Sequence, residues 1–192
     1  MKRRLALIAP SILTLGLVSV AYSQTDDVFA FIPDGGRTLL AGVVEAGVPE
    51  ETKTELLTGK RTSAEWLGYL EEQAPSVPSV ADMDEYQRQT LADYLAYNMP
   101  LSAVPETVDA STLPRDGRDF SLEYCQSCHI ITVVVTQERA REAWLGTMHR
   151  PSHIEVNLTE PEREALADYL VVNAGIPIEQ VPPELRAGGA SY

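Results

Sequence analysis

The stretch PEREALADYLVVN (161–173) has a close counterpart earlier in the chain, YQRQTLADYLAYN (86–98). Seven of the thirteen aligned positions are identical, and they include Leu166, Tyr169 and Leu170 of the second stretch. These three side chains are spaced by three and four residues, which places them on one face of an α-helix. Each stretch is therefore predicted to form an amphipathic helix.

Two further pairs of matching blocks lie upstream in the same order. AEWLGYL (64–70) matches EAWLGTM (142–148), and GRTLL (36–40) matches GRDFS (117–121). The offset between the copies shrinks along the chain, from 81 to 78 to 75 residues. Three blocks in one order indicate an internal duplication of a unit of roughly 75 residues, with small deletions in the loops of the second copy.

Capping sequences mark where several of these helices are expected to start. Residues 159–162 (TEPE) have the form of a capping box with proline in the first turn, and residues 82–85 hold the same place in the first copy. Thr62 (or Ser63) and Thr136 are expected to cap the helices that carry the two tryptophans. The helical unit is thus predicted to occur twice.

No alternating strand pattern of useful length is present, and the one β-like run, ITVVVT (131–136), is short. The predicted fold class is therefore all-α, with two tandem helical domains. Residues 99–116 are rich in proline, serine and threonine, which is typical of a linker. The predicted boundaries are a signal peptide over 1–23, a first domain over 25–104, a linker over 105–115, a second domain over 116–178 and a tail over 179–192.

The first 23 residues have the composition of a secretory signal. Three basic residues (2–4) precede an apolar run (5–20), and Ala21-Tyr22-Ser23 forms a small-x-small cleavage site. A membrane anchor is the alternative, but the apolar run is short for a spanning helix and is broken by Pro10 and Gly16. The protein is therefore expected to be exported to the periplasm, without stable membrane insertion after cleavage.

The chain is strongly acidic. It contains 15 Lys and Arg residues and 28 Asp and Glu residues, and loss of the three basic residues of the signal leaves a net charge of −16. Such a charge disfavours nucleic acid and anionic membrane surfaces as partners. It favours a protein partner with a basic docking surface, although acidic surfaces also serve solubility alone.

The stretch YCQSCHII (124–131) contains the only two cysteines of the chain, Cys125 and Cys128, followed directly by His129. Cys-x-x-Cys-His is the attachment signature of c-type haem, in which two thiols bind the porphyrin and the imidazole binds the iron. A thioredoxin-like redox pair would need a βαβ context, and a zinc site would need a second pair of ligands. A chance occurrence on a core helix is the remaining alternative.

Residues from about Asp116 to Asn173 resemble a class I-like cytochrome c domain, of the short monohaem type found in electron-transfer subunits of quinohaemoproteins and molybdoenzymes. The resemblance rests on GRDFSLEYCQSCHII, REAWLGTMHR and LTEPEREALADYLVVN. It implies one covalent haem c, a helix with the CxxCH motif that crosses a C-terminal helix with Tyr169, and a methionine on the far side of the haem.

Met148 is the best match for that methionine, and its counterpart in the first copy is Leu70. His149 and His153 compete for the same role, and a five-coordinate iron is a further alternative. Pro151 departs from the usual short-type pattern, because it lies where the helix would be expected to continue. Arg139, Arg141 and Arg150 are candidates for bonds to haem propionates, or simply belong to a solvated helix face.

The first copy lacks the residues that attach haem. The alignment places Val44, Gly47 and Val48 opposite Cys125, Cys128 and His129. The first domain is therefore expected to be a degenerate, haem-less cytochrome c-like unit with a structural or docking role.

The expected function is that of a periplasmic monohaem cytochrome that transfers single electrons, as a subunit or acceptor of a periplasmic dehydrogenase or as donor to a terminal acceptor. No constellation of catalytic acid, base and nucleophile is visible, so an electron carrier is expected rather than a catalyst. The alternatives are a haem enzyme or sensor with an open sixth iron position, which would bind peroxide or a gas, and a structural subunit with a vestigial haem.

Overall fold

The computed structural model describes residues 28–186, and in that range it contains helices and connecting segments but no strand. The predicted all-α class is therefore confirmed. The predicted signal peptide over 1–23 and the last residues of the predicted tail lie outside the described residues. Among residues 28–186, none of the helices combines the length and the apolar character needed to cross a bilayer.

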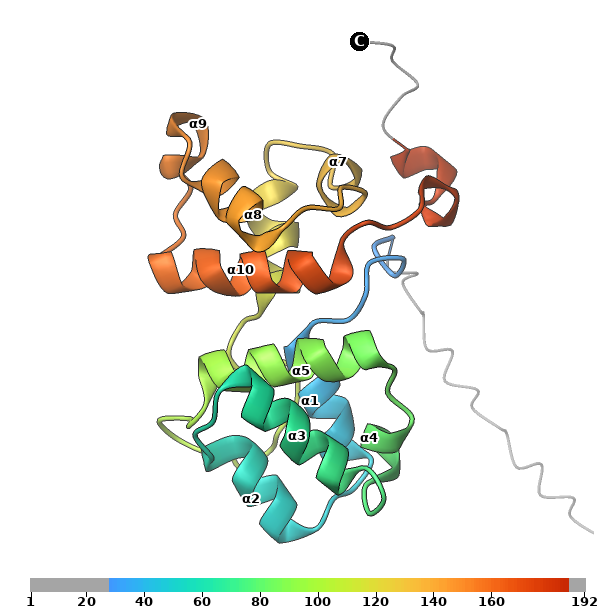
Figure 1. The fold of residues 1–192 in the computed structure, drawn as a ribbon, viewed down its shortest axis with the longest axis vertical. Coiled ribbons are helices and arrows are strands. Elements are labelled where there is room, and N and C mark those ends of the chain that lie inside the picture. The colour runs from blue at the N-terminus through green and yellow to red at the C-terminus, as the bar shows by residue number, and fades with distance from the viewer. Residues whose placement is uncertain (1–27, 187–192) are drawn as a thin grey trace, which may run out of the picture.

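The helices form two groups, one above the other in Figure 1. The first group consists of α1 (Gly36–Glu45), α2 (Glu50–Thr58), α3 (Ser63–Gln73), α4 (Pro78–Ala81) and α5 (Glu85–Asn98). The second consists of α6 (Gly117–Phe120), the π-helical turn η1 (Ser121–Cys125), α7 (Thr132–Val135), α8 (Arg141–Met148), α9 (Pro151–Ile154), α10 (Glu160–Asn173), η2 (Ile178–Gln180) and η3 (Pro183–Leu185). We call these groups the first and second halves; α5 and α10 contact each other at their junction.

Each half has its own hydrophobic core. The core of the first half centres on Trp66, Leu70, Leu91 and Leu95, and that of the second half on Trp144, Leu166, Tyr169 and Leu170. Segments outside the halves cross between them: Ile32, which precedes α1, is buried in the second core. The predicted domain boundaries and the cytochrome-like character of the two halves stay predictions.

Two of the expected helix starts are confirmed. Capping boxes begin α3 at Thr62 and α10 at Thr159, as expected. The box of α5 lies two residues later than the expected stretch 82–85, because Asp84 caps this helix together with Gln87. The cap expected at Thr136 is wrong, because α8 begins at Arg141 after Ala140, and Thr136 instead ends α7. The β-like run 131–136 is helical, since this winding buries Ile131, Thr132 and Val135 together against the second core.

Equivalent residues make equivalent contacts in the two halves. A β-carbon placed on Gly36 would lie 2.1 Å from the Tyr94 Cβ, and one placed on Gly117 would lie 2.2 Å from the Tyr169 Cβ. Both pairs join the first helix of a half to its last helix. Only glycine permits so close a crossing, because any side chain would meet backbone or the root of the tyrosine side chain.

The two tryptophans are held in the same way. The Arg61 guanidinium lies over the Trp66 ring at 4.8 Å from its centre, and Arg139 lies over Trp144 at 5.1 Å. Both arginines precede their tryptophan by five residues. These matched cation–π contacts support the duplication predicted from the sequence.

The two halves hold each other by reciprocal hydrogen bonds. The Tyr94 hydroxyl donates to the Pro114 carbonyl at 2.9 Å, and the Tyr169 hydroxyl donates to the Pro33 carbonyl at 2.6 Å. Each proline precedes the first helix of the half to which the tyrosine does not belong. Asn173 adds a buried bond to the Thr90 hydroxyl at 2.8 Å.

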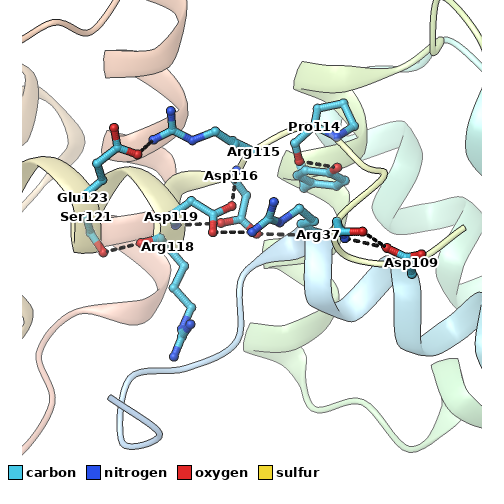
Figure 2. A network of polar contacts seen from close by, with 11 residues as sticks. Arg37, Asp109, Pro114, Arg115, Asp116, Arg118, Asp119, Ser121 and Glu123 are labelled. Atoms are coloured by element: carbon cyan, nitrogen blue, oxygen red, sulfur yellow. Dashed lines mark hydrogen bonds and ion pairs between the residues drawn. The ribbon is translucent and has the colours of Figure 1, made fainter. Parts of the chain in front are cut away.

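Asp116 caps one helix in each half (Figure 2). One carboxylate oxygen accepts the Asp119 N–H of α6 at 3.0 Å, and the other accepts the Arg37 N–H of α1 at 2.9 Å. The Arg37 guanidinium also pairs with the Asp119 carboxylate at 2.6 Å. Gly35, the residue before α1, leaves the space for this carboxylate, because a β-carbon there would lie 2.1 Å from it.

Asp116→Ala is expected to lower the free energy of unfolding by about 2 kcal/mol or more, since each lost cap costs about 1 kcal/mol and the site is buried. Asp84→Ala is the matched control, because Asp84 caps only α5 and is exposed. Urea unfolding followed by circular dichroism measures both. Equal losses in the two variants would contradict the double cap.

Burial raises the pKa of Asp116 above its ordinary value of 3.8. A raised folded-state pKa means that the part of the stability linked to this titration is full below 3.8 and is lost as the pH rises through the folded pKa, whereas the two capping bonds remain. Asp116→Asn removes the titrating group, so its stability should vary less across that window than the stability of the unaltered protein.

Candidate functional site

A cavity of about 390 Å³ opens in the second half between η1, α7, α8, α9 and α10. This volume lies within the range of about 300–1,000 Å³ that is typical of cofactor and small-molecule sites. All four residues predicted to hold haem line it. The lining residues are Tyr124, Cys125, Cys128, His129, Val133, Val134, Gln137, Arg139, Trp144, Thr147, Met148, Ser152, His153, Val156, Leu158, Arg163, Leu166 and Leu170.

The CxxCH motif forms one wall of the cavity. The π-helical turn η1 ends at Cys125, whose carbonyl accepts the N–H groups of Cys128 at 3.3 Å and His129 at 2.9 Å. The backbone therefore coils tightly through the motif and brings both thiols and the imidazole to the same cavity. π-Helical turns of this kind are frequent at functional sites.

The two thiols are free and differ in environment: Cys125 is half-buried and Cys128 is exposed. Burial, and then the neighbouring Cys128, raise the pKa of the Cys125 thiol to about 11. A thioredoxin-like redox pair would need a βαβ context, and residues 28–186 contain no strand. The fold therefore disfavours the thioredoxin-like alternative.

The end of α8 and helix α9 also line the cavity, through Thr147, Met148, Ser152 and His153. Met148 is the last residue of α8, is buried and packs in the second core. His153 lies on α9, which begins at Pro151. Pro151 therefore does what its sequence position suggested: it ends the continuation of α8 and starts a short new helix.

The three histidines divide between the cavity and the surface. His129 and His153 both line the cavity, whereas His149 does not. The His149 Nε2 lies 3.0 Å from both carboxylate oxygens of Glu160, and its side chain is exposed. Of the two histidines that compete with Met148, only His153 is therefore placed to face the motif.

A buried arginine fixes the wall that carries Met148 and His153. The Arg163 guanidinium is only 5% exposed and donates to the carbonyls of Met148 and Val156 at 2.9 Å. It also reaches the carbonyls of His153 and Ile154, each at 3.4 Å. One side chain on α10 thus bonds both the last residue of α8 and the C-terminal end of α9.

Arg163 was not predicted from the sequence, although its position contained a signal of a structural role. Arg163 precedes Leu166 by three residues on the apolar face of α10, and the first half has Arg88 at the matching position. A charged residue on the buried side of a helix, repeated in both copies, indicates a structural bond. Arg88 donates to the carbonyl of Met83.

Of the three arginines considered for propionates, only Arg139 lines the cavity. It also donates to the Thr147 hydroxyl at 3.0 Å. Arg141 pairs with Asp168 on α10 instead. Trp144 is buried and lines the cavity as well.

In the first half, apolar side chains stand at the positions that correspond to the motif and to Met148. Val44 and Val48 pack against the first core, and Leu70, the counterpart of Met148, is 1% exposed within it. Helix α2 adds Leu56 and Leu57 to this core. None of these side chains could attach or ligate haem.

A scan against protein-family models found no match to this chain, and searches of the curated proteins and of the solved structures found none either. Within residues 28–186, no group of three or more His, Cys, Asp or Glu side chains is arranged to hold a metal ion by itself. What can be inferred about function therefore rests on the residues of the cavity.

Proposed function

We propose that this protein is a c-type cytochrome that binds one haem in its second half and transfers single electrons. The observation that carries the proposal is the cavity, which brings Cys125, Cys128 and His129 to one wall of a large space. The tandem arrangement of a haem-binding and a haem-less cytochrome c-like domain is part of the same proposal, and the matched contacts of the two halves support it.

The residues present fit a covalent haem. The two thiols, which would bind two vinyl groups, both line the cavity, and so does the imidazole that follows directly in the chain. Valine and leucine side chains form much of the remaining wall, which suits a flat apolar macrocycle. Met148 and His153 also line the cavity, and either could supply a second ligand to the iron.

Each of these residues has a definite task in the proposed function. Haem, when bound, supplies an iron centre that gains and loses one electron. Cys125 and Cys128 would hold it by thioether bonds, and His129 would ligate the iron. The apolar wall from α7 and α10 would exclude water, which helps to set the reduction potential.

The cellular setting is proposed from charge and from the N-terminal sequence. A cleaved signal peptide over 1–23 would deliver the protein to the periplasm, where covalent attachment of haem would be completed. The net charge of −16 after cleavage favours a basic redox partner, such as a periplasmic dehydrogenase or a terminal acceptor. The first half would serve in docking or as structural support.

The test is an optical spectrum of the exported protein, oxidised and reduced, together with its haem-to-protein ratio after denaturation. We expect one covalent haem per chain, a sharp low-spin reduced spectrum and reversible one-electron reduction. A chain without covalent haem would refute the proposal. A high-spin spectrum that shifts with carbon monoxide would refute the carrier function and favour an enzyme or sensor with an open iron position.

A further inference from the structure

We propose that His153, rather than Met148, is the second axial ligand of the haem iron, opposite His129. The inference rests on the proposed function and deepens it, because the choice of ligand sets the reduction potential. Three features of the described residues carry it. They are the distance between the His129 and His153 rings, the hydrogen bond of the His153 ring to Ser152, and the bonds from Arg163 that hold the helix on which His153 lies.

The first feature is the separation of the rings. The centres of the His129 and His153 rings lie 6.1 Å apart, and their planes are inclined by 27°. Two metal–imidazole bonds of about 2.0–2.1 Å each, with roughly 1 Å from each nitrogen to its ring centre, span about 6 Å. The rings are stacked, and the distance between their centres matches the span that two imidazoles bound to one iron would need.

The second feature is a hydrogen bond between the His153 ring and the Ser152 hydroxyl. The His153 Nδ1 lies 3.0 Å from the Ser152 hydroxyl oxygen. When Nδ1 donates to this hydroxyl, Nε2 carries the lone pair that a metal needs. Metal-ligating histidines almost always have such a partner on their second nitrogen, because it fixes both the tautomer and the ring orientation.

The third feature is the set of interactions that hold α9, the helix on which His153 lies. Proline at the first position of α9 fixes the backbone where the helix starts. The Arg163 guanidinium then bonds the carbonyls of His153, Ile154 and Val156, so the segment is tied to α10 on its buried side. His153 therefore sits on a short helix that is held at several points, as a ligand should be.

The location of Met148 has a simpler explanation. Its counterpart Leu70 is a buried core residue in the first half, where no residue that could attach haem is present. Met148 is likewise buried in its own core. The methionine thus fills the same place as a leucine, and packing accounts for it without an iron bond.

The test compares three variants of the haem-loaded protein by optical and electron paramagnetic resonance spectra. We expect the unaltered protein to be low-spin in both oxidation states without the far-red methionine–iron band. His153→Ala should become high-spin and bind carbon monoxide, and added imidazole should restore the low-spin spectrum. Met148→Leu, which introduces the side chain that Leu70 has in the first half, should keep the low-spin spectrum of the unaltered protein.

His149→Ala is the matched control, because it removes a histidine four residues away that pairs with Glu160 outside the cavity. It should leave every spectrum unchanged. A methionine–iron band in the unaltered protein that disappears in Met148→Leu would overturn the proposal. Absence of covalent haem from the unaltered protein would instead refute the proposed function itself, so the two failures are distinguishable.

Discussion

Gly117→Ala is expected to lower the free energy of unfolding by about 1–3 kcal/mol or more, the usual cost of forcing extra atoms into a packed contact. The added methyl group would lie 2.2 Å from the Tyr169 Cβ and 2.9 Å from the Ala165 carbonyl oxygen. Neither atom can swing away, because one is backbone and the other is the root of its side chain. α6 and α10 must therefore move apart, which also disturbs the wall of the cavity.

Gly36→Ala should have the same effect in the first half, where the methyl group would meet Tyr94. Gly42→Ala is the matched control in the same helix, because nothing lies within 4 Å of a β-carbon there. It should stabilise the protein by about 0.5–1 kcal/mol, the usual gain from replacing glycine in a helix interior. Thermal or urea unfolding by circular dichroism measures all three variants. A neutral Gly117→Ala would contradict the close crossing.

Replacement of both cysteines, Cys125→Ala with Cys128→Ala, is expected to abolish covalent haem entirely. It should also destabilise the second half selectively, because an open cavity of about 390 Å³ would lose its proposed occupant while the first half has its own packed core. Hydrogen exchange followed by mass spectrometry resolves this. Protection should fall in α7, α8 and α10 and persist in α1, α3 and α5.

Ser127→Ala is the control for this double variant. Ser127 lies between the cysteines and donates to the Tyr124 carbonyl at 2.7 Å, so the substitution alters the same turn but keeps both thiols and His129. It should retain one covalent haem. Equal loss of protection in both halves of the double variant would show that the halves unfold as one unit, contrary to the prediction.

Local signals predicted most of the helices. The caps at Thr62 and Thr159 depend only on residues three positions apart, so they are visible in the sequence, whereas the box of α5 was predicted two residues too early. The run 131–136 misleads because β-branched residues favour strands, whereas burial against the second core decides its helical form. Thr136 fails as a helix start because the chain needs four more residues to reach the beginning of α8.

The residues of the candidate site likewise differ in whether a local sequence pattern predicts them. The CxxCH motif is contiguous, so its three residues could be named from the sequence, and Met148 could be placed near them by comparison with Leu70. The choice between His149 and His153 depends on which way a short helix faces after Pro151. The double cap of Asp116 joins residues 79 positions apart, so no local sequence pattern predicts it.

The reciprocal bonds of Tyr94 and Tyr169 give the junction the form of an isologous contact, in which each partner offers the same surface to the other. Such contacts ordinarily join two separate chains into a symmetric homodimer. Here both partners belong to one polypeptide, so their association does not depend on protein concentration. Because the two partners have separate sequences, matching positions can differ between them. Asp116 supplies a carboxylate at the junction, and Gly35, which aligns with it, leaves the space that this carboxylate fills.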